Sequence, residues 1–267
     1  MSRWSFACLL GASLAGPAFG QQRPEPQLLL TMFGGVSSGV GLWEINRQPY
    51  ARRSDATTHD TLRLVRRLES GLTLGASATI FPGPNLGFTA EIVYLGFNVD
   101  DDCTIAFLNP SVVNLGENQE VCADVTRTGA SASVLAFTVG TIVRAASRSF
   151  ASPYLRGQVG ITARNSSTVE MQGRFLFNNT PQARLVIDDP RGGAVYPTAA
   201  FGAGVMIPLG PGYQVRLEGR NQLLLVRQAT GVADALLVPP TGTKVVHSLG
   251  LLIKLDIVLE QRRGRRY

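Results

Sequence analysis

The residues Tyr213-Gln-Val-Arg-Leu-Glu-Gly-Arg-Asn-Gln222 alternate between apolar and polar side chains over most of their length. Tyr213, Val215 and Leu217 share one face of an extended chain. The opposite face is polar throughout and consists of Gln214, Arg216, Glu218, Arg220 and Gln222. Because successive side chains of a β-strand point to opposite faces, this period of two predicts a strand with one apolar and one polar face.

The same alternation recurs along the chain. Near the end, one face carries Val245, Leu249, Leu251, Ile253, Leu255, Ile257 and Leu259. Its opposite face carries Ser248, Gly250, Lys254 and Asp256, interrupted by Val246, Leu252 and Val258. With 29 glycines and much Thr and Val, helix propensity is low. We predict an all-β chain of eight strands, at residues 27–45, 61–81, 86–98, 128–145, 153–165, 195–207, 213–227 and 244–259.

Short and long links alternate between these strands. The short ones lie at residues 82–85, 146–152 and 208–212, and two of them are rich in Pro and Gly. The long ones lie at residues 46–60, 99–127, 166–194 and 228–243. This order is typical of an up-and-down antiparallel transmembrane barrel with short periplasmic turns and long external loops.

The polar faces carry charges of both signs in mid-strand. These residues are Glu69, Glu91, Arg156, Arg216, Glu218, Arg220, Lys254 and Asp256. An arginine that faces lipid near the bilayer midplane costs about 2–4 kcal/mol, so we expect all eight to form a charge network inside the barrel. A soluble lipocalin-like barrel, which would show its polar faces to water, is the alternative interpretation.

The first residues indicate export. Arg3 precedes a largely apolar run over residues 4–14, and Ala18-Phe19-Gly20 gives a small-x-small pattern before polar residues. We expect residues 1–20 to be a signal peptide and residues 21–267 to form one barrel domain with a short basic tail at 260–267. The formal charge of +6 is modest and spread along the chain, and nucleic-acid binding is not expected of an exported chain of this kind.

Two cysteines follow the expected signal peptide. In an oxidising compartment Cys103 and Cys122 are expected to form a disulfide, which would close a loop of about 20 residues and contribute roughly 3 kcal/mol. A metal site is the rival interpretation, but it lacks nearby histidines or a second cysteine pair.

Over residues 27–259 the arrangement resembles the eight-stranded outer-membrane barrels of the outer-membrane protein A, X and W families and the opacity-type surface proteins. The resemblance implies residence in the outer membrane, contact with lipid and lipopolysaccharide, and a monomer without cofactor. One feature departs from these families, whose last strand usually ends on an aromatic residue. Here the strand ends at Leu259, and Tyr267 would serve only if the strand ran further.

Candidate chemistry is sparse. His247 and Ser248 are adjacent, so a strand would place them on opposite faces, whereas lipid A deacylases use a His-x-Ser arrangement on one face. His59 is expected in a loop. The acidic second loop allows a calcium site, although no EF-hand spacing is present. Basic residues of the first loop suit lipopolysaccharide phosphates or a solvated rim equally well: Arg47, Arg52 and Arg53, with Arg63, Arg66 and Arg67 beyond them.

These observations favour a non-enzymatic barrel with a structural or surface-interaction role carried by its external loops. A narrow porin-like channel for small solutes or ions is the second hypothesis, with the interior charges lining the pore. A lipid A-modifying enzyme and a soluble binder are the others.

Overall fold

The structure is a computed structural model that describes residues 26–50, 59–110, 116–145, 150–164, 167–189, 194–234 and 237–260. It consists almost entirely of antiparallel strands. In chain order the elements are β1 (Gln27–Ser37), β2 (Val40–Tyr50), β3 (Asp60–Leu68), β4 (Gly71–Phe81), β5 (Leu86–Phe107), α1 (Glu117–Arg127), β6 (Ala130–Arg144), β7 (Ser152–Arg164), β8 (Met171–Phe177), β9 (Thr180–Ile187), β10 (Ala194–Gly210), β11 (Tyr213–Ala229) and β12 (Thr241–Glu260).

Eight strands close into a barrel. The hydrogen-bonded order is β5-β4-β1-β12-β11-β10-β7-β6, and β6 pairs with β5 to complete the ring. The first and last strands meet along their length, from the pair Gln27–Glu260 to the pair Ser37–Gly250. The prediction of an eight-stranded antiparallel barrel is therefore confirmed. Among the described residues, the helix α1 lacks the length and apolar character that a membrane-spanning helix needs.

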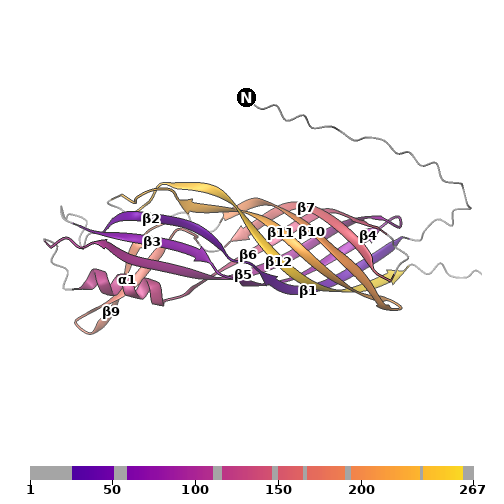
Figure 1. Cartoon of the computed structure of the whole chain (residues 1–267), viewed down its shortest axis with the longest axis horizontal. Coiled ribbons are helices and arrows are strands. Elements are labelled where there is room, and N and C mark those ends of the chain that lie inside the picture. The colour runs from indigo at the N-terminus through magenta and orange to yellow at the C-terminus, as the bar shows by residue number, and fades with distance from the viewer. Residues whose placement is uncertain are drawn as a thin grey trace, which may run out of the picture.

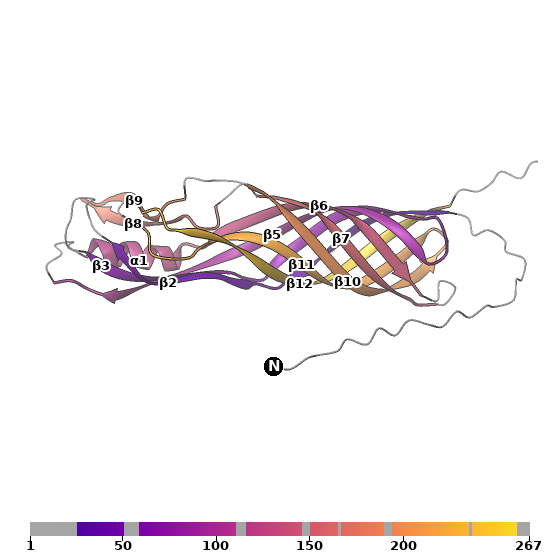
Figure 2. The ribbon, with the colours of Figure 1, turned by 90° about the horizontal axis from the view of Figure 1, so that it is seen from above.

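Beyond one end of the barrel the sheet continues as an external extension. Here β2 and β3 prolong β1 and β4 and pair with each other, and β3 also pairs with the far half of β5. Figures 1 and 2 show this extension as one end of an elongated molecule, with the short turns at the other end. The predicted loop boundaries were therefore wrong, because β2 reaches Tyr50 and β5 reaches Phe107.

The reason lies in charges that looked like loop residues. Asp101 of β5 faces Arg66 of β3 across the strand pair, and Asp100 faces Arg67. The Arg66 guanidinium donates to both Asp101 carboxylate oxygens at 2.6 Å. Cross-strand ion pairs of this kind stabilise the pairing of β3 with β5. The alternation of apolar and polar residues does not predict this pairing.

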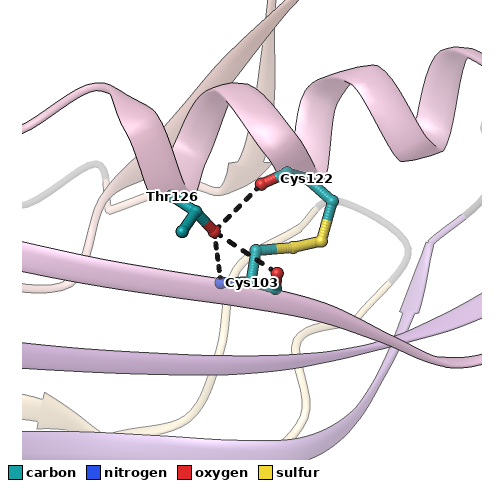
Figure 3. Close-up of a disulfide and its surroundings, with 3 residues drawn as sticks. All are labelled: Cys103, Cys122 and Thr126. Carbon is teal, nitrogen blue, oxygen red and sulfur yellow. Dashed lines mark hydrogen bonds between the residues drawn. A yellow bond between two sulfur atoms is a disulfide. The ribbon is translucent and has the colours of Figure 1, made fainter.

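Helix α1 lies along β5 and is covalently attached to it. The Cys103–Cys122 disulfide joins the two elements with a Cα–Cα distance of 5.1 Å, which confirms the predicted bridge. In Figure 3 the Thr126 hydroxyl lies beside the bridge, where it accepts a hydrogen bond from the Cys103 amide at 3.1 Å. The extension also holds the β8–β9 hairpin, whose turn residues Asn178 and Asn179 take positive φ values of 49° and 61°.

The barrel wall has the alternation that the sequence predicts. In β11, Leu217 is 45% exposed on the outside, whereas Arg216 and Glu218 are buried inside. Outward side chains of all eight barrel strands form an apolar belt, which includes Leu30, Met32, Leu74, Phe88, Phe137, Val159, Phe201, Leu251 and Ile253. The apolar face of the barrel is therefore its outer surface, which excludes the soluble lipocalin-like arrangement.

Candidate functional site

The barrel interior contains a buried network of charged side chains from four strands. Glu91 of β5 receives hydrogen bonds from Arg156 of β7, at 2.7 Å, and from Arg220 of β11. The Lys254 ammonium of β12 lies 3.0 Å from a Glu218 carboxylate oxygen and 3.5 Å from a Glu91 oxygen. These five residues are at most 6% exposed, so they sit in a medium where charges must be paired.

A second cluster lies next to this network, toward the turn end. Arg216 and Asp256 form an ion pair at 2.6 Å, with Arg216 exposed by only 1%. The Thr31 hydroxyl donates to Asp256 at 2.7 Å, and the Gln214 amide donates to the other oxygen of the same carboxylate at 2.6 Å. The Asp256 carboxylate of β12 thus accepts hydrogen bonds from three residues on its two neighbouring strands, β1 and β11, and both of its oxygens have donors.

Seven of the eight residues predicted for the interior lie in these two clusters; Glu69 does not. Glu69 is exposed at the break between β3 and β4, where its amide donates to the Asn98 carbonyl. The break shifts the alternation by one residue, so that Leu68 points inward in β3 and Thr73 points inward in β4. Counting by twos through a continuous strand therefore assigned Glu69 to the wrong face.

Apolar layers enclose the charged residues from both ends. Toward the short turns, Leu29, Phe81, Ile142, Tyr154 and Met206 form a buried cluster. At the other end of the barrel, next to the extension, a larger buried core begins at Phe33 and Leu252 and continues into the extension. Tyr154 donates to Glu218 at 2.7 Å, and the Phe33 ring lies 4.6 Å from the Lys254 ammonium, so both apolar layers contact the network directly.

Some buried polar atoms in and beside the charged network have no hydrogen-bond partner in the protein. Among the described residues these include Nε and Nη2 of Arg220, Nε of Arg156, Oε1 of Glu218 and Nε2 of Gln158. Buried polar atoms of native proteins normally have partners, and internal water supplies those that the protein lacks. The two charged clusters therefore retain hydrogen-bonding capacity that the described side chains do not use.

The predicted basic rim is not a free patch. Arg66 is buried against Asp101, and Arg63 pairs with Glu44 at 2.8 Å. Arg47 is exposed on β2, and Arg52 and Arg53 lie outside the described residues. Over the described part of the chain no group of three His, Cys, Asp or Glu side chains is arranged to hold a metal ion.

Sequence reasoning missed the contacts that close the extension. The Trp43 indole donates to the Thr168 carbonyl at 2.9 Å, and the Thr168 hydroxyl donates to the Arg227 carbonyl at 2.7 Å. The fully buried Gln48 side chain accepts from the Ala233 amide at 2.7 Å. These bonds link β2 to the loops beside β7 and β11, and a lone Gln or Thr gives no sequence signal for such a role.

His247 does not form a nucleophile–base pair with its neighbour Ser248. His247 is exposed on the outer wall, whereas Ser248 is buried inside, as their adjacency predicts. The His247 Nδ1 atom lies 3.2 Å from the Asn221 side-chain nitrogen on β11. His59 is exposed at the start of β3.

A closed ring of strands, an apolar outer belt and buried charges inside form the arrangement in which β-structure can cross a bilayer. The chain is a membrane-spanning β-barrel. No protein-family model matches its sequence, and a search of curated proteins finds no significant relative.

Solved outer-membrane barrels resemble it at low identity. The outer membrane protein AlkL, studied in lipid bilayers, is 10% identical with a TM-score of 0.45, and the alignment covers 96% of this chain and 99% of AlkL. Neisserial surface protein A is 9% identical with a TM-score of 0.42, covering 86% and 96%. The protease OmpT of Escherichia coli is 9% identical with a TM-score of 0.38, covering 92% and 99%. The assignment as a membrane barrel rests on this chain's own belt and interior.

Proposed function

We propose that the barrel is a closed membrane anchor and that its external extension carries out a surface interaction. The observation that carries the proposal is the interior itself. Each of the seven interior charged side chains has an oppositely charged partner, and apolar layers lie on both sides of them. A pore would require a continuous polar path, which these layers interrupt.

The rigid packing of the extension supports its proposed role in a surface interaction. A surface that binds a partner benefits from being rigid before binding, because less entropy is then lost. Helix α1 is held by a disulfide, and its Asp124 and Glu120 carboxylates accept hydrogen bonds from the backbone of β8 at 2.7 and 3.0 Å. The extension is thus a packed platform, on which exposed apolar residues such as Leu176 and Phe177 are presented.

Planar-bilayer recording tests the closed barrel. The purified protein is expected to give no steady conductance under conditions in which a general porin, used as a positive control, conducts. A steady conductance that shifts its ion preference in Arg156→Ala or Glu218→Ala would overturn the proposal in favour of the narrow channel. Gel mobility with and without boiling shows for each variant that the barrel has folded.

A deletion tests the surface interaction. Residues 171–187, which form the β8–β9 hairpin, are replaced by a short Gly-Ser linker in cells that display the whole protein. Retention of these cells on an array of matrix proteins and glycans is expected to fall, while outer-membrane integrity stays unchanged. Equal retention of both kinds of cell on every spot, or a leaky membrane in the deletion strain, would contradict this role for the extension. We also propose that the chain is monomeric and has no catalytic activity; unchanged lipid A mass spectra on overexpression are expected.

A further inference from the structure

Helix α1 and the β8–β9 hairpin enclose a hollow on the surface of the extension. Its volume is about 650 Å³, within the usual range of ligand sites. Figures 1 and 2 show the two elements next to each other in the extension. On α1 the hollow is lined by Gln119, Ala123 and Arg127, which are four residues apart and so share one face of the helix. On β8 it is lined by Arg174 and Leu176, which share one face of the strand.

Two hydrogen bonds hold the walls of the hollow together. The backbone amide of Arg174 donates to the Asp124 carboxylate at 2.7 Å, and that of Leu176 donates to the Glu120 carboxylate at 3.0 Å. β8 is an edge of a two-stranded sheet, and these bonds occupy the amides with which a further strand would pair. A partner therefore binds through the side chains of the hollow and not by adding a strand to β8.

The charged side chains of the hollow differ in how far their bonding capacity is used. The Glu120 and Asp124 carboxylates each accept a hydrogen bond from the backbone of β8. Arg127 and Arg174 line the same hollow, and within the part of the chain that the structure describes neither guanidinium group has an ion pair or a hydrogen bond. A guanidinium group presents paired donors that match a carboxylate, so these two side chains are suited to an anionic group from outside the chain.

The hollow has a cationic end and an apolar end. Through its amide Arg174 is level with the second half of α1, where Arg127 also lies, in the last turn. Leu176 is level with the first half of α1; it is 57% exposed and lies opposite the exposed Pro181 of β9. From Gln119 to Arg127 the helix rises about 12 Å, which is the length of roughly four residues of extended chain.

We propose that this hollow binds an extended segment of a partner protein. An acidic side chain of the segment lies against the two arginines, and an apolar side chain two residues away lies against Leu176 and Pro181. This spacing follows from Arg174 and Leu176, which are two residues apart on one face of β8 and so about 7 Å apart along an extended chain. The proposal rests on the surface interaction proposed above, to which it assigns a site and a partner chemistry.

The lining favours a peptide over an acidic sugar. Sugar rings bind by stacking on exposed aromatic faces and by many hydrogen bonds. The aromatic side chain of this hollow, Phe175, is half-buried and packs against the core, and Gln119 is its one amide side chain. The small, half-buried Ala123 leaves room between the walls for an aliphatic side chain.

A random library of acetylated hexapeptides on beads tests the proposal. The full chain is placed in nanodiscs that contain a fluorescent phosphatidylcholine, with empty nanodiscs as the blank, and the peptides on the brightest beads are sequenced. Peptides with an acidic residue and an apolar residue two positions apart are expected to be enriched over the unselected library. Binding of a selected peptide should weaken as NaCl rises from about 50 to about 300 mM, because exposed charges are screened.

Three variants separate the two ends of the hollow from general charge. Arg127→Gln/Arg174→Gln is expected to weaken binding of a selected peptide by at least roughly tenfold, at about threefold to tenfold for each lost charged contact. Ala123→Leu fills the space between the walls and should weaken binding of every selected peptide. Arg47→Gln removes an exposed arginine of β2 outside the hollow and should leave binding unchanged. Limited proteolysis at the wild-type rate shows that the extension of each variant has folded.

Several outcomes would overturn the proposal. These are a library without enriched peptides, enrichment of peptides without acidic residues, wild-type affinity in the double arginine variant or in Ala123→Leu, and an equal loss of affinity in Arg47→Gln. If the double arginine variant lost retention of cells on glycan spots alone, the hollow would belong to an acidic sugar instead. If deletion of the hairpin lowered cell retention while the double arginine variant did not, the surface interaction would stand and its site would lie outside the hollow.

Discussion

Arg156 on β7 and Glu91 on β5 form an ion pair at 2.7 Å across the barrel interior, although β6 separates their strands in the sheet. The ion pair therefore links β5 and β7 through the barrel interior, in addition to the backbone hydrogen bonds that each strand makes with β6. Lys254 and Arg220 converge on the same Glu91 carboxylate from β12 and β11. Glu91 is thus the anion on which strands from opposite sides of the ring depend.

Removing the Glu91 charge should weaken the barrel strongly. In Glu91→Gln, three buried cations lose a shared partner, and Glu218 alone is left to neutralise them. Breaking a buried ion pair from one side costs about 3–5 kcal/mol, because it leaves buried charge uncompensated. Urea titration in liposomes, read by gel mobility of unboiled samples, measures the free energy of unfolding. A loss below about 1 kcal/mol would mean that the cluster is hydrated well enough to tolerate unpaired charge.

An exposed ion pair provides the matched control. Glu44 pairs with Arg63 on the extension, and both side chains are more than 40% exposed. Glu44→Gln removes one carboxylate charge in the same way, yet a pair of this kind contributes only about 0–1 kcal/mol. The two variants together separate the effect of burial from the effect of charge.

Breaking the Cys103–Cys122 bridge should loosen the extension without opening the barrel. The bridge closes a loop of 19 residues in sequence separation, and in the chain-entropy model it contributes roughly 3 kcal/mol. In Cys103→Ser/Cys122→Ser, limited proteolysis is expected to cut near α1 much faster than in the wild type. Gel mobility of the barrel should stay the same. Protease resistance equal to that of the wild type would show that the α1 carboxylate contacts with β8 hold the helix by themselves.

The extension should also lose stability at high pH through Tyr50. Burial raises the pKa of the Tyr50 phenol from its ordinary value near 10 to about 12, partly offset by the Arg184 charge. The folded state therefore keeps the proton at pH values where the unfolded chain has released it. This contribution, about 2–3 kcal/mol, is fully present below pH 10 and is lost as the pH rises toward 12.

Tyrosine absorbance during an alkaline titration checks the raised pKa of Tyr50. The wild type should show one late step near pH 12 that is missing in Tyr50→Phe. Hydrogen exchange of β2 and β9 should then be less dependent on pH between 10 and 12 in the variant, because Tyr50 also donates to the Leu185 carbonyl of β9. An identical late step in both proteins would assign it to another of the six tyrosines.

The sequence predicts the wall better than it predicts the extension, for a physical reason. In the wall each strand has lipid on one face and the interior on the other. Adjacent residues such as Leu217 and Glu218 therefore point to opposite faces, and the period of two is visible in the sequence. The extension is buried on more than one side, and residues such as Leu42 and Trp43 are both buried although adjacent. Irregular pairing between Ile45 and Gln48 hides the period of two there as well. Long-range contacts, such as Gln48 with Ala233, have no local signature.

A single added methyl group should show how tightly the interior is packed. Gly75 of β4 faces inward beneath the Phe33 ring, and a Cβ atom there would overlap the ring and the Ile92 carbonyl oxygen. Gly75→Ala is therefore expected to displace Phe33 from Lys254 and to destabilise the barrel by about 1–3 kcal/mol, the usual cost of overpacking. Gly41→Ala on β2 is the control, because an added Cβ there has open space, and its change should stay within about 0.5 kcal/mol. Both changes are measured by the same urea titration. Equal stability of the two variants would mean that the Phe33 ring moves freely, and the outer apolar layer would then not hold the Lys254 ammonium in place.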